Sequence, residues 1–237
     1  MGVFEIMTVL KCEGLTKNYG PVKALDSIDL SVESGRIVGL LGPNGSGKTT
    51  LIKIASRLLV PSAGRIEICG KAPSAETKAE VAYLPDRDYL PGWMKVSELI
   101  GMYADFFKDF DRERAERMTA SLGLDGNMLL RKLSKGNKEK VQLILTMSRR
   151  AKLYLLDEPI AGVDPAARDY ILDTILSNYD EEATVLISTH LISDVESVLD
   201  EAVFLKQGKV VLHKATDDVR QETGKSLDGY FREVFRC

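Results

Sequence analysis

The sequence predicts an α/β fold in which a helical insertion interrupts the sheet-forming parts of the chain. Short runs rich in Val, Ile and Leu recur in both halves, as in residues 36–41 and 152–157, and such runs are typical of strands buried on both faces of a sheet. Between them, residues 86–150 repeat apolar residues at helical spacing. With 237 residues, 44% of them hydrophobic, the chain can bury a sizeable core. We expect a single domain over 1–237 with a helical subdomain at 86–150.

Short strands are predicted first along the chain. Residues 7–15, 27–32 and 36–41 are β-rich and are separated by the turn-forming segments KNYGP and ESG. Because residues 7–15 already read as an opening strand, Met1 and Met7 both remain plausible starts. The N-terminus has no signal-peptide pattern, and no stretch approaches the roughly 18 apolar residues needed to span a bilayer.

Helix and strand signals alternate after the third strand. Residues 49–59 are helix-like, the Pro-Ser-Ala-Gly segment at 61–64 ends that helix, and a strand follows at 65–70. The insertion then shows helical periodicity without a convincing strand. Strands return at 152–157 and 183–188, with helices between and after them, so the second half resumes the α/β core. A further strand-rich stretch covers residues 201–213.

Charge and cysteine usage exclude several classes of protein. The net charge is −3 and basic residues are scattered among acidic ones, so we expect no nucleic-acid partner. Cys12, Cys69 and Cys237 are far apart and include no CxxC pair, which argues against a disulfide framework and a zinc site. A reducing cytoplasm is the simplest setting.

A glycine-rich segment, GPNGSGKTT, lies between a predicted strand and a predicted helix. Its pattern, Gly42-x-x-x-x-Gly47-Lys48-Thr49, fits a phosphate-binding loop. Backbone N–H groups and the helix N-terminus favour phosphate, Lys48 would reach the β- and γ-phosphates, and Thr49 would ligate Mg²⁺. A simple tight turn would need neither the lysine nor the threonine. The candidate nucleotide-binding residues are Gly42, Pro43, Asn44, Gly45, Ser46, Gly47, Lys48, Thr49 and Thr50.

Two carboxylates end the apolar run at residues 152–157. An open α/β sheet presents catalytic groups at the carboxyl ends of its strands. Asp157 would orient Mg²⁺, through a water molecule, and Glu158 would polarise the water that attacks the γ-phosphate. A solvent-exposed acidic strand end is the alternative. Together with the phosphate loop, the two carboxylates predict nucleotide triphosphate hydrolysis.

The chain resembles the nucleotide-binding subunit of an ATP-binding cassette transporter over nearly its whole length. Further motifs occur in that family's order: KNYG with Tyr19, YLPD ending at Asp86, LSKGN, AGVD ending at Asp164, and STH ending at His190. The resemblance implies a P-loop NTPase core with an N-terminal antiparallel β subdomain and an inserted α-helical subdomain. It also implies that ATP and Mg²⁺ are the cofactors.

The resemblance assigns roles to residues outside the phosphate loop. Tyr19 should stack on adenine, although strand-end packing is an equally common role for a tyrosine. His190 should contact the γ-phosphate and join Lys48 and Glu158 as a catalytic residue. Ser134 and Gly136 of one subunit should contact the nucleotide held by a second subunit, and Asp164 is counted among the cofactor-binding residues. Hydrolysis would then need two cassettes.

Two departures from the family pattern bear on activity. The segment LSKGN has Lys135 and Asn137 where the family usually has LSGGQ; Lys135 would either attract phosphate or serve as a solvated residue at a helix start. Asp86 stands where the family usually has glutamine. Asp86 offers only acceptor oxygens and a negative charge, so metal coordination is expected to survive while the positioning of water is in doubt.

The resemblance implies an ATPase subunit that forms a homodimer around two ATP molecules. It also implies that the subunit drives a separate integral membrane permease from the cytoplasmic face, for export. The C-terminal SLDGYFREVF segment and the modified LSKGN are similar to exporter-type cassettes. Tyr89 and Trp93 are a candidate docking surface for the permease, or else part of the helical core. His213 is expected at the surface. The alternative function is a soluble cassette ATPase that assists a non-transport assembly.

Overall fold

A three-stranded antiparallel sheet opens the computed structural model, which describes residues 7–236. The strand order is β2-β1-β4. Along β2 the residues Ile28, Leu30 and Val32 are buried while the residues between them are exposed, the alternation expected of a sheet with one solvated face. The strands are β1 (Thr8–Tyr19), β2 (Val22–Glu33) and β4 (Ala63–Ile68).

The central sheet has six strands in the order β5-β6-β7-β3-β8-β9. Every neighbouring pair is parallel except the antiparallel hairpin of β8 and β9. Every residue of β3 and β6 is buried, which explains their continuous apolar sequences. The strands are β3 (Ile37–Leu41), β5 (Val81–Leu84), β6 (Leu153–Asp157), β7 (Thr184–Thr189), β8 (Glu201–Lys206) and β9 (Lys209–Ala215). The carboxyl ends of the parallel strands therefore meet at one edge.

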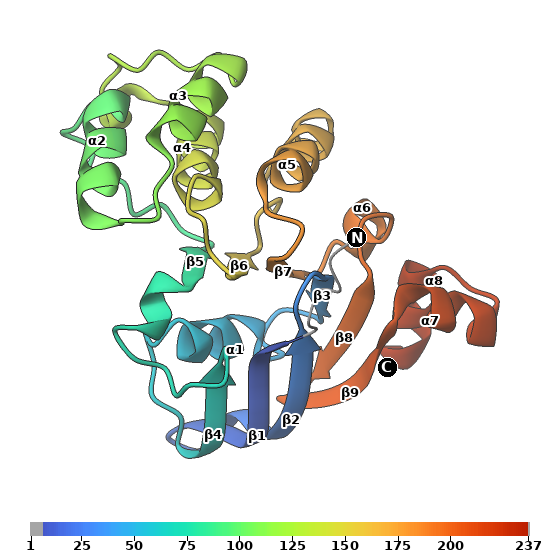
Figure 1. Cartoon of the computed structure of the whole chain (residues 1–237). Helices are drawn as coiled ribbons and strands as arrows, with labels where there is room; N and C mark the ends of the chain where they lie inside the picture. Colours follow the sequence, from blue (N-terminus) through green and yellow to red (C-terminus); the bar gives the residue numbers. More distant parts are fainter. Residues whose placement is uncertain (1–6, 237) are drawn as a thin grey trace, which may run out of the picture.

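Helices cover the central sheet and contribute to two hydrophobic cores. One core joins α1 and the antiparallel sheet to one face of the central sheet, and the other joins the remaining helices to the opposite face. In Figure 1, α7 and α8 lie beside β8 and β9. The helices outside the insertion are α1 (Lys48–Ala55), α5 (Pro165–Asn178), α6 (Ile192–Val195), α7 (Thr216–Thr223) and α8 (Leu227–Val234).

Three α-helices lie between β5 and β6 in the chain and form a group of their own in space. Figure 1 shows α2, α3 and α4 together, on the far side of the central sheet from β1, β2 and β4. They are α2 (Val96–Phe106), α3 (Arg112–Ser121) and α4 (Lys135–Met147). The short 3-10 turn η2 (Leu130–Lys132) precedes α4, whereas the turn η1 (Thr77–Ala79) lies before β5. Their buried side chains join the core on the adjacent sheet face.

The structure confirms an α/β fold with an antiparallel N-terminal sheet, and it corrects three local expectations. The helix expected over 49–59 ends at Ala55, because Arg57 adopts a left-handed φ of 54°. The predicted turn KNYGP is mostly strand, since β1 continues to Tyr19. The four-residue strand β5 was missed. Within residues 7–236, no helix combines the length and apolarity that crossing a membrane requires.

Candidate functional site

The phosphate loop connects the carboxyl end of β3 to the start of α1. Gly45 and Gly47 have φ angles of 80° and 113°, which only glycine adopts readily. A Cβ atom on Gly47 would lie 2.5 Å from the Ala24 carbonyl oxygen, so no side chain fits there. The sequence therefore needs glycine at this turn for both conformation and space.

Lys48 is held inside the loop by backbone carbonyl groups. Its Nζ donates hydrogen bonds to the carbonyl oxygens of Gly42, at 2.7 Å, and Pro43, at 3.3 Å. The side chain is only 5% exposed. A cavity of about 310 Å³ opens over the loop and is lined by Ala24, Asn44, Gly45, Ser46, Gly47, Lys48, Thr49, Thr50, Asp86 and Glu158. Backbone N–H groups, a helix N-terminus and a lysine at one cavity suit an anionic ligand.

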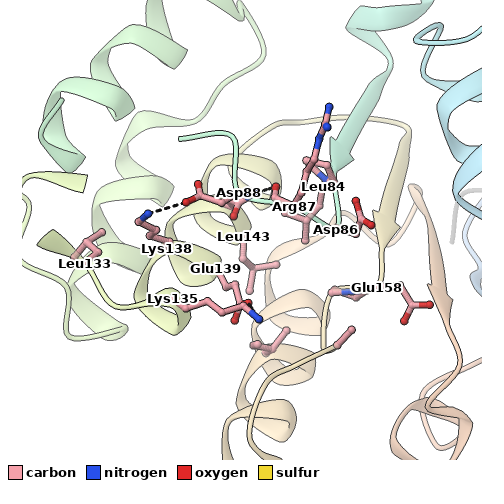
Figure 2. Close-up of a pocket in the computed structure, with 15 residues that line it drawn as sticks. Leu84, Asp86, Arg87, Asp88, Leu133, Lys135, Lys138, Glu139, Leu143 and Glu158 are labelled. Carbon is pink, nitrogen blue, oxygen red and sulfur yellow. Dashed lines mark hydrogen bonds and ion pairs between the residues drawn. The ribbon is translucent and has the colours of Figure 1, made fainter. Parts of the chain in front are cut away.

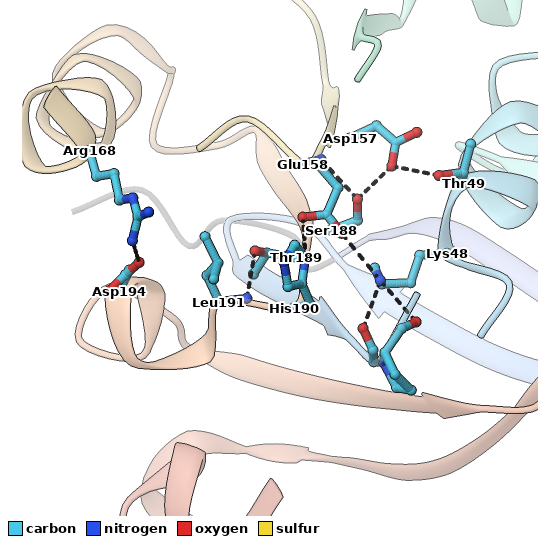
Figure 3. Close-up of polar contacts among 12 residues, drawn as sticks. Lys48, Thr49, Asp157, Glu158, Arg168, Ser188, Thr189, His190, Leu191 and Asp194 are labelled. Atoms are coloured by element: carbon cyan, nitrogen blue, oxygen red, sulfur yellow. Dashed lines mark hydrogen bonds and ion pairs between the residues drawn. The ribbon is translucent and has the colours of Figure 1, made fainter. Parts of the chain in front are cut away.

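Asp157, the last residue of β6, joins the phosphate loop to the neighbouring strand β7. Its Oδ1 accepts hydrogen bonds from Thr49 Oγ1, at 3.1 Å, and from Ser188 Oγ, at 2.7 Å (Figure 3). The side chain is fully buried and its Oδ2 has no hydrogen-bond partner. Burial raises the pKa of Asp157 above its usual range, although the hydrogen bonds from Ser188 and Thr49 oppose that shift. An unpartnered buried carboxylate oxygen beside a threonine hydroxyl fits a Mg²⁺ site.

Glu158 follows directly and is fixed from several sides. Its φ of 52° is left-handed, an uncommon conformation for a residue with a side chain. The backbone N–H donates to the carbonyl oxygen and the hydroxyl of Ser188, at 3.0 and 3.1 Å. Oε1 lies 3.2 Å from Lys48 Nζ, and Oε2 lies 3.0 Å from His190 Nδ1 (Figure 3). Three predicted catalytic residues thus meet at one carboxylate.

Sequence reasoning gave no role to Ser188, although it contacts both carboxylate residues. It lies in β7 between Ile187 and Thr189, in a strand whose residues are all buried, and it is itself fully buried. A serine directly after the apolar run 185–187 is the signal that marks it, because a buried hydroxyl needs hydrogen-bond partners.

The remaining predicted residues are distributed around the cavity or away from it. Asp86 follows β5 by two residues and lines the cavity. Tyr19 ends β1, is 46% exposed, and has Lys17 Nζ at 5.4 Å from its ring centroid. It does not line the cavity. Asp164 is an exposed residue that directly precedes α5.

Ser134 and Gly136 also lie outside the cavity of their own chain. Both are exposed at the N-terminal end of α4. Ser134 caps the helix, with its Oγ accepting a hydrogen bond from the Asn137 N–H at 3.3 Å. One chain therefore does not bring these two residues to the phosphate loop.

The comparisons with known proteins agree with this geometry. The family model described as "ABC transporter" matches residues 25–161, which include the phosphate loop, Asp86 and both carboxylates. The chain belongs to the ABC transporter family. It is an ATP-binding subunit of that family and hydrolyses ATP. Subunits of this kind dimerise and work with membrane permeases.

Similar ABC proteins cover nearly the whole chain. The "Daunorubicin resistance ATP-binding protein DrrA3" of Streptomyces coeruleorubidus is 32% identical over 236 residues, covering 96% of this chain and 75% of the relative. The "SkfA peptide export ATP-binding protein SkfE" of Bacillus subtilis is 30% identical over 211 residues, covering 86% of this chain and 88% of the relative. A solved ATP-binding subunit of an ABC transporter superposes with a TM-score of 0.86 at 28% identity, covering 97% of this chain and all of that one.

Proposed function

We propose that this chain forms a homodimer around two ATP molecules with Mg²⁺ and drives export through a separate membrane permease. The observation that carries the proposal is the meeting of Lys48, Glu158 and His190 beside the phosphate loop (Figure 3). In this proposal the chain is a single ATPase domain, and residues 86–150 are its helical subdomain.

Thr49, Asp157 and Asp86 are the proposed holders of Mg²⁺, and Thr49 and Asp86 line the same cavity. Support comes from the unpartnered Asp157 Oδ2 and from its fixed contact with the Thr49 hydroxyl. Hard cations prefer carboxylate, hydroxyl and water oxygens of this kind. When bound, Mg²⁺ would offset negative charge on the phosphates.

Lys48, Glu158 and His190 are the proposed catalytic residues. Lys48 neutralises charge on the β- and γ-phosphates, Glu158 takes a proton from the attacking water, and His190 contacts the γ-phosphate. The ion pair of Lys48 with Glu158 and the contact of His190 with the same carboxylate support these roles, because they fix the carboxylate at the cavity wall. The remaining phosphate-loop residues contact the phosphates, and Tyr19 contacts the base.

A second copy of the chain supplies the missing contacts. Ser134 and Gly136 are exposed on α4 and do not line the cavity of their own chain. In a two-fold dimer the same surface serves both subunits, so each chain can complete the site of the other. Asp164 is proposed to lie at the same dimer interface.

An exposed aromatic surface is the proposed permease contact. Trp93 is 73% exposed and Tyr89 is 40% exposed, whereas large aromatic side chains usually pack. Docking there would place the chain on the inner face of the cell membrane. Export is proposed because the names of DrrA3 and SkfE refer to drug resistance and to peptide export.

Two experiments test the proposal. ATP with Mg²⁺ should convert the Glu158→Gln variant from monomers to dimers in sedimentation, and adding Ser134→Arg should restore monomers because it places bulk and charge in the interface. Purification from membranes should recover the chain with an integral membrane protein, and Trp93→Ala should reduce that recovery. Absence of an ATP-dependent dimer would refute the dimer, and recovery with soluble proteins alone would refute the transport role.

A further inference from the structure

Two neighbouring parallel strands place Ser188 directly beside Asp157. Asp157 ends β6, Ser188 is the last residue but one of β7, and the two residues are register partners in the central sheet. Both are 0% exposed. Because bulk water does not reach either side chain, their polar atoms depend on hydrogen bonds within the protein.

Ser188 does not itself line the nucleotide cavity. Figure 2 shows Asp86 and Glu158, the two carboxylate residues that do line it, with their carboxylates directed to the same side of the view. Ser188 lies behind Glu158 and contacts its backbone (Figure 3). Any effect of Ser188 on a ligand in the cavity must therefore act through a neighbouring residue.

The Ser188 hydroxyl has one proton, and its two neighbours decide where that proton points. The Glu158 N–H donates a hydrogen bond to Ser188 Oγ at 3.1 Å, which occupies a lone pair of the oxygen. The hydroxyl donates its own proton to Asp157 Oδ1 at 2.7 Å. An N–H can only donate and a carboxylate oxygen accepts, so Ser188 offers Asp157 a donor of fixed direction.

Two hydroxyl groups hold the same oxygen of Asp157. Thr49 Oγ1 donates to Oδ1 at 3.1 Å, and the Ser188 contact is the shorter of the two, as expected of a strong hydrogen bond to a carboxylate. Turning the carboxylate away would break both bonds. Oδ2 is the oxygen left without a hydrogen-bond partner among residues 7–236. Thr49 is also a proposed metal ligand, whereas Ser188 is held by protein groups alone.

We infer that Ser188 is a positioning residue for the metal site, because its hydroxyl fixes the Asp157 carboxylate with Oδ2 free toward Mg²⁺. The inference rests on the proposed function, since it requires Asp157 to hold Mg²⁺. Residues that orient a metal ligand without touching the metal typically change metal affinity 10- to 100-fold when they are replaced. Ser188 thus joins the site without contacting nucleotide or metal.

The test measures metal affinity without turnover. Mn²⁺ is titrated into the protein with a non-hydrolysed ATP analogue and followed by electron paramagnetic resonance, with the protein-free analogue as the blank. Ser188→Ala should raise the dissociation constant for Mn²⁺ about tenfold or more and leave the affinity for the metal-free analogue unchanged. Ser188→Cys keeps a similar size with a weaker donor and should change the constant in the same direction. Ser188→Thr keeps the hydroxyl and should restore Mn²⁺ affinity.

A matched control separates metal positioning from a general loss of stability. Thr184 lies in the same strand, is 0% exposed, and donates through its hydroxyl to the Glu33 carbonyl oxygen at 2.9 Å. Thr184→Val removes this buried hydroxyl and keeps the shape of the side chain. It should lower the thermal stability and leave the Mn²⁺ affinity unchanged. A Thr184→Val variant that loses as much Mn²⁺ affinity as Ser188→Ala would overturn the inference.

A double-mutant cycle shows whether Ser188 acts through Asp157. Asp157→Ala should weaken Mn²⁺ binding, and adding Ser188→Ala to it should weaken binding no further, because the hydroxyl then has no carboxylate to orient. Unchanged affinity in Ser188→Ala and Ser188→Cys, or additive losses in the double variant, would overturn the inference while leaving the proposed function intact. Unchanged Mn²⁺ affinity in Asp157→Ala would overturn both the inference and the proposed metal site.

Discussion

Lys48 Nζ lies 3.2 Å from Glu158 Oε1, across the cavity that both residues line. The two side chains are 5% and 13% exposed, and the second carboxylate oxygen of Glu158 faces His190. A phosphate entering this cavity would compete with Glu158 for the lysine, because both are anions. Binding of ATP would then free one oxygen of Glu158 to contact water. Phosphate binding would thereby prepare Glu158 to act as the base.

Lys48→Ala should weaken ATP binding by about 10- to 100-fold, because one charge-assisted hydrogen bond contributes roughly 1.5–3 kcal/mol. Calorimetric titration with a non-hydrolysed ATP analogue would measure the change. Lys53→Ala is the matched control, since Lys53 lies in the last turn of the same helix, α1. Equal ATP affinity in the wild type and the Lys48 variant would contradict the loop assignment.

Asp157→Asn should raise the free energy of unfolding near neutral pH. Burial is the largest cause of the raised pKa of Asp157, so the folded protein binds a proton there more tightly than the unfolded chain does. The ionised Asp157 carboxylate therefore lowers the free energy of unfolding at pH values above the folded-state pKa. This loss of stability disappears as the pH falls through that pKa. Asparagine keeps an oxygen for Thr49 and Ser188 but has no charge.

Thermal unfolding in the presence of a chelator, from about pH 8 down to about pH 5, checks this sign. The stability advantage of Asp157→Asn over the wild type should shrink as the pH is lowered. An Asp157→Asn variant that is less stable than the wild type at neutral pH would contradict this prediction.

Asp86→Asn should increase the Mg²⁺ concentration needed for half-maximal ATP hydrolysis about threefold or more, because a charged ligand oxygen becomes neutral. Asp86→Gln restores the side chain usual in the family and should keep or raise turnover. Mg²⁺ titrations of the wild type and both variants provide the comparison. Superimposable curves would remove Asp86 from the metal site.

The parts of the fold that could be predicted are those with strong local signals. The strands β3 and β6 are continuous apolar runs, and the phosphate loop needs glycine, lysine and threonine at fixed spacing. The end of α1 could not be placed, because the left-handed Arg57 is not a residue that usually ends a helix. β5 was missed since four residues carry too little periodicity to mark a strand.

The contacts within the site were harder to predict than its members. Thr49 and Asp157 were both named as metal ligands, but their hydrogen bond joins residues 108 positions apart in the chain. Lys138 and Asp88 are 50 positions apart and look like ordinary surface charges in the sequence. Only the fold brings such pairs together, because parallel strands gather their carboxyl ends at one edge of the sheet and α4 packs beside it.

The most direct test of the central claim is the rate of ATP hydrolysis by Glu158→Gln at saturating ATP and Mg²⁺. Glutamine keeps the size of the side chain but cannot accept the proton, so turnover should fall by a factor of about 100 or more while ATP still binds. Phosphate release from the purified variant and the wild type, measured together with ATP affinity, gives both quantities. Near-normal hydrolysis by Glu158→Gln would contradict the account of this site.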